Sequence, residues 1–64
     1  MVTSRKTLAS GNRITVETEV VGEAARVSIG YSLEPTERDK AEALQAVAFA
    51  MGMVGMPYTV LSGG

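Results

Sequence analysis

The sequence predicts a small α+β protein: a ββα(β) unit in which an antiparallel hairpin is covered on one face by one helix and is completed by oligomerisation. Two consecutive segments alternate apolar and polar residues as half-buried strands do, a helix-capping signal follows them, and no side chain after Glu42 carries a charge. We expect one domain over residues 13–61, a flexible basic arm over 1–12 and a flexible tail over 62–64.

The two alternating segments are predicted to form a β-hairpin with a defined register. Apolar side chains recur at every second position of each segment, and Gly22–Glu23 between them suits a two-residue turn of type II′, in which the first position needs a positive φ. A slip by one residue would put the two apolar sets on opposite faces. The turn predicts these pairs: Ile14 with Tyr31, Val16 with Ile29, Thr18 with Val27, Val20 with Ala25, and Glu19 with Arg26.

A helix is predicted from Thr36 to Met51. Thr36 and Asp39 have the spacing of a capping box, and acidic side chains in the first turn suit the positive end of the helix dipole. Gly52 is expected to end the helix as its C′ residue. The apolar segment Tyr58–Leu61 is then predicted to form a short last strand.

The second half of this helix is apolar on all sides, and one hairpin covers only one of them. The side predicted to cover the hairpin carries Ala41, Leu44, Val47, Ala48 and Met51. The residues left over form the candidate subunit or partner interface, namely Ala46, Phe49, Met53 and Met56. The alternative is that residues 56–61 fold back over Phe49 and cover it.

The composition favours self-association. Among 64 residues there are no Cys, no Trp, one Phe and two Tyr, so neither disulfides nor large aromatic side chains strengthen a thin core. We therefore expect a homo-oligomer that also contacts a protein partner. The absence of Cys, and an N-terminus in which polar residues follow Arg5 and Lys6, favour a cytoplasmic protein without a signal peptide.

Catalysis has little support in the residues present. Without His and Cys, zinc sites, His-dependent triads and thiol chemistry are not available. Glu17 and Glu19 share the exposed face of a strand, where a carboxylate pair is best interpreted as solvation and an ion pair to Arg26. We therefore expect no enzyme activity, no catalytic residues, no metal site and no cofactor.

Basic residues near the N-terminus indicate an alternative partner. Arg5, Lys6 and Arg13 give the first 13 residues three positive charges and no negative one, and Arg26 lies on the outer face of the predicted hairpin. These four are candidate phosphate-binding residues of a nucleic-acid-binding dimer. Against this alternative, no aromatic side chain points outward from the strands to stack on a base.

Membrane insertion is not expected. The uncharged run over residues 43–61 approaches the length of a spanning helix, but Gly52, Gly55 and Pro57 interrupt it and Ala outweighs Leu and Ile. The sequence thus favours a small non-enzymatic homo-oligomer that acts through protein contact as an adaptor, inhibitor or assembly component. Its size suits an accessory protein of a phage or plasmid.

Overall fold

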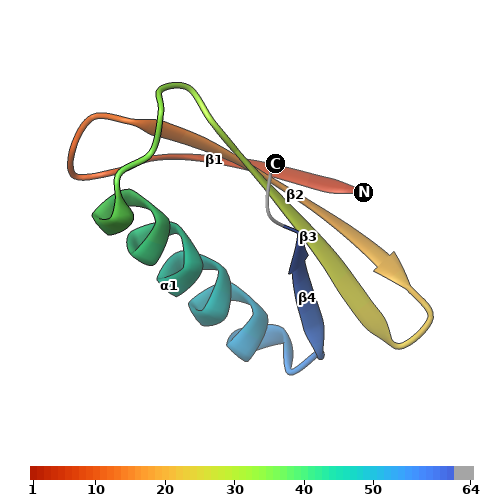
Figure 1. The fold of residues 1–64 in the computed structure, drawn as a ribbon. Coiled ribbons are helices and arrows are strands. Elements are labelled where there is room, and N and C mark those ends of the chain that lie inside the picture. Colours follow the sequence, from red (N-terminus) through yellow and green to blue (C-terminus); the bar gives the residue numbers. More distant parts are fainter. Residues whose placement is uncertain (62–64) are drawn as a thin grey trace.

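The computed structural model describes residues 1–61 as one mixed sheet with a helix on one face (Figure 1). The four strands lie in the order β1-β2-β3-β4; the first three are antiparallel, and β4 is parallel to β3. The predicted α+β class, with a hairpin packed against a helix, is confirmed, whereas the predicted tail lies outside the described residues. The elements are β1 (Val2–Thr7), β2 (Arg13–Val21), β3 (Ala24–Tyr31), α1 (Glu37–Val54) and β4 (Tyr58–Leu61).

The hairpin of β2 and β3 has the predicted register. Val16 lies opposite Ile29 and Glu19 opposite Arg26, as the turn at Gly22 requires. Gly22 has a φ of 64°, and among residues 1–61 no residue other than glycine has a positive φ. This combination fits a type II′ turn, because a type I′ turn would require a positive φ at Glu23 as well.

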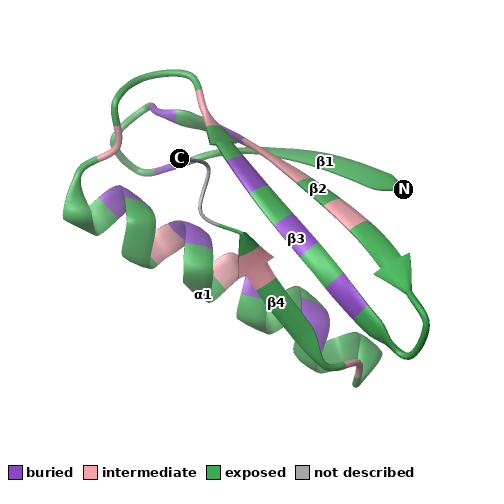
Figure 2. Ribbon diagram, turned by 45° about the vertical axis from the view of Figure 1, so that its right-hand side comes forward, coloured by how far each residue is buried: buried purple, intermediate pink, exposed green. Residues whose placement is uncertain are grey.

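The core lies between the sheet and α1, and every second residue of β3 points into it (Figure 2). The helix contributes a row spaced by four residues, which begins at Asp39 and ends at Met51. The predicted helix face was partly wrong, since Ala41, Leu44 and Ala48 are exposed. A row spaced by four residues drifts around a helix, so the contact face shifts from turn to turn. The buried apolar residues are Leu8, Ile14, Ala25, Val27, Ile29, Ala43, Val47 and Met51.

Strand β1 was not predicted, because residues 1–12 were expected to be a flexible arm. Apolar and polar side chains do not alternate along this segment, and all of its residues are exposed. Backbone pairing with β2 over its full length holds it as an edge strand. A tight turn returns the chain, in which the Leu8 N–H donates to the Asn12 carbonyl at 2.7 Å and Gly11 has a φ of 94°.

The helix ends three residues later than predicted. Gly52 lies inside α1, and Gly55 is the C-cap, with a φ of 72° and an N–H that donates to the Met51 carbonyl at 2.9 Å. Both glycines suit a C-cap by sequence, but only Gly55 precedes Pro57 closely enough for Pro57 to block a further turn. The position of the helix end therefore follows from Gly55 and Pro57 together.

The last strand forms as predicted and pairs in parallel with β3. The Ala25 N–H donates to the Pro57 carbonyl at 2.9 Å, which starts this pairing directly after the helix cap. The alternative in which residues 56–61 cover Phe49 is wrong, because Phe49 remains 73% exposed. Within residues 1–61, no helix combines the length and hydropathy needed to cross a membrane.

The position of the helix end predicts opposite changes in stability for alanine substitutions at two glycines. Gly52→Ala should stabilise the protein by about 0.5–1 kcal/mol, because alanine is the better helix residue and its Cβ meets no atom within 4 Å. Gly55→Ala should destabilise it by about 1–2 kcal/mol, because its φ is left-handed. Urea unfolding of both variants measures the difference. Destabilisation by Gly52→Ala would mean that the helix ends at Gly52 after all.

Candidate binding surfaces

A buried polar network joins the β1–β2 turn to the start of α1. Asn12 is 2% exposed and sits between the two. Its Nδ2 donates to Oδ2 of Asp39 at 3.2 Å and to the Leu33 carbonyl at 3.0 Å. Its Oδ1 accepts hydrogen bonds from the Ser32 hydroxyl and the Leu33 N–H, both at 3.0 Å. One amide side chain thereby fixes the turn, the end of β3 and the helix relative to each other.

Asp39 completes this network from the helix side. Its Oδ1 accepts a hydrogen bond from the Ser10 hydroxyl at 2.7 Å, and its Oδ2 accepts one from the Thr36 N–H at 3.1 Å. The Asp39 N–H donates to Oγ1 of Thr36 at 3.1 Å, so the predicted capping box is present. The hydrogen bond from Ser10, followed by those from Thr36 and Asn12, lowers the pKa of Asp39 below its usual value.

The contact between Ser10 and Asp39 supports the fold rather than catalysis. A carboxylate whose pKa is lowered is a weaker base, and both oxygens of Asp39 already accept hydrogen bonds from the chain. Among residues 1–61, no buried side-chain nitrogen or oxygen lacks a hydrogen-bond partner. The same residues contain no group of three or more carboxylates placed to hold a metal ion. The network therefore positions the neighbouring surfaces.

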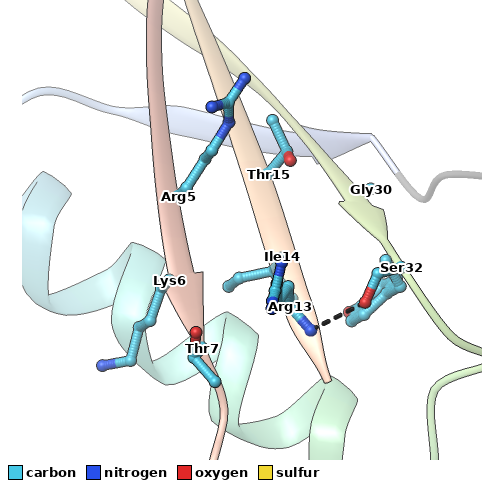
Figure 3. Close-up of a pocket in the computed structure, with 9 residues that line it drawn as sticks. Arg5, Lys6, Thr7, Arg13, Ile14, Thr15, Gly30 and Ser32 are labelled. Carbon is cyan, nitrogen blue, oxygen red and sulfur yellow. Dashed lines mark hydrogen bonds between the residues drawn. The ribbon is translucent and has the colours of Figure 1, made fainter. Parts of the chain in front are cut away.

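The first of these surfaces is the open face of the sheet, opposite α1. At one end of this face, a hollow of about 520 Å³ lies between the basic side chains of Arg5 and Arg13 (Figure 3). Arg5 lies opposite Thr15, and Thr7 lies opposite Arg13. We call this hollow the Arg5–Arg13 site. Its lining residues are Arg5, Lys6, Thr7, Arg13, Ile14, Thr15, Gly30, Tyr31 and Ser32.

The four candidate phosphate-binding residues do not lie together in the structure. Arg5 and Arg13 lie together, but Lys6 pairs with the buried Ile14 and its side chain points away from both arginines (Figure 3). Arg26 lies opposite Glu19, near the other end of the sheet. Along β2, Glu19 is about 14 Å from Thr15, the residue that pairs with Arg5. Lys6 is among the lining residues, but of the four only Arg5 and Arg13 have side chains on the face that carries the site.

The second surface is a groove of about 680 Å³ between α1 and β1, on the helix side of the sheet. We call it the α1–β1 groove. Phe49 and Ala46 of the helix line one side, and Ser4 and Lys6 of β1 line the other. The groove lies where α1 leaves the helix side of β1 uncovered, and all residues of β1 are exposed. Its remaining lining residues are Arg5, Ile14, Val16, Glu42, Gln45, Val47 and Ala50.

The candidate interface residues differ in exposure. Phe49 is 73% and Met53 77% exposed, as expected for an uncovered second face of the helix. Ala46 is half-buried, and the half-buried Met56 packs against the core instead. Val54, which was not predicted, is exposed beside them at the helix end. The apolar surface is therefore centred on Phe49 and the last turn of α1.

Several residues of these sites were missed from the sequence. Asn12 was assigned to the flexible arm, although the turn-forming run Ser10-Gly11-Asn12 precedes a strand and is typical of a tight turn. Thr15 and Gly30 carry no signal of their own and belong to the Arg5–Arg13 site only because of the strand register.

Comparison with known proteins adds no functional assignment. No family model matches the chain, and no curated protein or solved structure matches it significantly. Function therefore has to be inferred from the surfaces themselves.

The lowered pKa of Asp39 predicts how stability depends on pH. Since its folded pKa lies below the usual 3.8, the carboxylate stabilises the fold above about pH 4, and this contribution is lost as the pH falls through the folded pKa. Asp39→Asn should therefore lower stability clearly at pH 6 and less at pH 3. Chemical unfolding of both proteins at the two pH values checks this. An equal difference at both values would contradict a stabilising charge.

Proposed function

We propose that the protein is a small non-enzymatic homo-oligomer that acts through protein contact, as an adaptor, inhibitor or assembly component. The observation that carries this proposal is the exposure of Phe49, at 73%, beside an open groove in the same molecule. The occupant we propose for the α1–β1 groove is a second copy of the chain.

The width of the sheet supports this proposal. Neighbouring strands lie about 4.8 Å apart, so the axes of the two outer strands are separated by about 14 Å. A helix with its side chains is about 10–12 Å across. The single helix packs over the core residues of β2 and β3, and the half-buried Val60 of β4 joins them. The helix side of β1 is left open for a second helix.

The same surface is complementary to itself. Phe49 forms an apolar projection at the rim of the groove, and Ile14 and Val16 of β2 contribute apolar lining. In a two-fold dimer, each copy can place its Phe49 in the groove of the other. All charged side chains of α1 lie at or before Glu42, so the second halves of two helices can meet without burying a charge.

The solvent-accessible surface area is larger than a compact monomer of this mass exposes, as an uncovered interface would make it. The accessible surface is 4636 Å², whereas a compact monomer of this mass, 6.7 kDa, exposes about 3,900 Å². Docking of a second copy would cover apolar surface that a monomer leaves in water, which stabilises the fold as well as the assembly.

The alternative, a nucleic-acid-binding dimer, has less support. Its four basic residues were expected to form one surface, but Lys6 lies on the helix side and Arg26 lies opposite Glu19. A cytoplasmic location and an accessory role in a phage or plasmid stay predictions from composition.

The proposed assembly gives a direct prediction. Phe49→Asp should convert a dimer or higher oligomer into monomers, because the variant loses the apolar burial of the phenyl ring and a charge must leave water at the interface. Sedimentation equilibrium at micromolar concentration measures the mass. Val21→Asp is the matched control: Val21 is also an exposed apolar residue, but it lies on the open face of the sheet, so this variant should remain associated. A monomeric wild-type protein under these conditions would refute the proposal.

A further inference from the structure

We propose that the Arg5–Arg13 site binds a phosphate or diphosphate group of a small phosphorylated molecule. The site lies on the open face of the sheet, opposite the α1–β1 groove. Arg5, Lys6 and Ile14 line both hollows, but Arg13, Thr15 and Gly30 line only the site, so a second copy in the groove leaves them uncovered.

The donors that an oxyanion needs are present and uncommitted. Within residues 1–61, neither guanidinium group makes an ion pair or a hydrogen bond, and the hydroxyls of Thr7 and Thr15 make no hydrogen bond either. A guanidinium group offers five N–H donors in a planar arrangement that matches phosphate oxygens in pairs. Two of them facing one hollow, with two hydroxyls between, provide charge and directed hydrogen bonds together.

The backbone around the site is fixed and leaves room for a ligand. The Arg13 N–H donates to Oγ of Ser32 at 3.0 Å, and the Ser32 N–H donates to the Arg13 carbonyl at 2.9 Å, which extends the β2–β3 pairing to the edge of the hollow (Figure 3). Gly30 lies next to Thr15 in the register and has no side chain to fill the space. A Cβ at Gly30 would meet nothing within 4 Å.

The charges on this face favour a compact ligand over an extended strand of nucleic acid. Moving along β2 from the site, the next outward residues are Glu17 and Glu19. A chain of phosphates laid along the strands would reach Glu17 about 7 Å and Glu19 about 14 Å beyond Thr15, and their charges would repel it. Lys6 cannot extend the basic surface, because it belongs to the other face. The positive region thus spans one or two phosphate groups.

Titration of the ¹⁵N-labelled full chain with pyrophosphate tests the proposal by NMR. We expect saturable shifts of the amide signals of Thr15 and Gly30 and of the side-chain Nε–H signals of Arg5 and Arg13. Loss of one charged hydrogen-bond donor weakens binding by about tenfold or more, so Arg13→Gln should raise the dissociation constant by that factor.

Two further variants separate this site from general electrostatic attraction. Gly30→Val keeps every charge and suits a strand, since the φ of Gly30 is not positive, but its side chain would fill the hollow and should abolish binding. Arg26→Gln removes a positive charge from the same face of the sheet, but Arg26 lies opposite Glu19 outside the hollow, so this variant should change the dissociation constant less than twofold. The amide spectrum of each variant shows whether the fold is retained.

A parallel titration with a single-stranded DNA decamer distinguishes the source of the phosphate. Pyrophosphate binding that Arg13→Gln weakens, Gly30→Val removes and Arg26→Gln preserves supports the proposal. It is overturned if pyrophosphate causes no saturable shift, or if Arg26→Gln weakens binding as much as Arg13→Gln. Binding of DNA alone, with a steep salt dependence, would also overturn it in favour of an extended polyanion. The oligomeric state decides none of these outcomes, so the proposed assembly can fail separately.

Discussion

The hydrogen-bond network centred on Asn12 and Asp39 is the constraint on which the rest of the molecule depends. Asn12 ends the turn that returns β1 against β2, and Asp39 caps the helix that covers the sheet. A buried amide with four partners and a carboxylate with three tolerate few other arrangements, because each broken bond would leave a buried polar group unpaired. The placement of β1 beside β2 and the first turn of α1 are therefore coupled.

One helix over four strands makes the two faces of the protein chemically different. On the helix side, α1 leaves β1 uncovered, and Phe49 stands at the edge of the opening. The other side is a polar sheet face with positive charge at one end and carboxylates beyond it. A second copy suits the first surface because apolar groups gain most from leaving water. A phosphate suits the second because its donors are charged and exposed.

The parts that local patterns determine could be predicted from the sequence. Alternation and the turn at Gly22 predicted the hairpin register, and the spacing of Thr36 and Asp39 predicted the helix start. What was missed depends on tertiary contact. Strand β1 has no apolar alternation and forms because the β2 edge supplies its hydrogen-bond partners, and Asn12 shows its role only once Asp39 lies beside it. Both arginines were identified, but their grouping without Lys6 follows from the register.

The central claim is that β1 is an edge strand of the sheet, held against β2 by the turn that ends at Asn12. Both proposed surfaces depend on it, because both include β1 residues. Inter-strand backbone NOEs in the labelled full chain test this most directly. The account predicts NOEs that place Arg5 opposite Thr15 and Lys6 opposite Ile14. A β1 segment that shows no NOEs to β2, or a register shifted by one residue that moves Arg5 to the helix side, would contradict it.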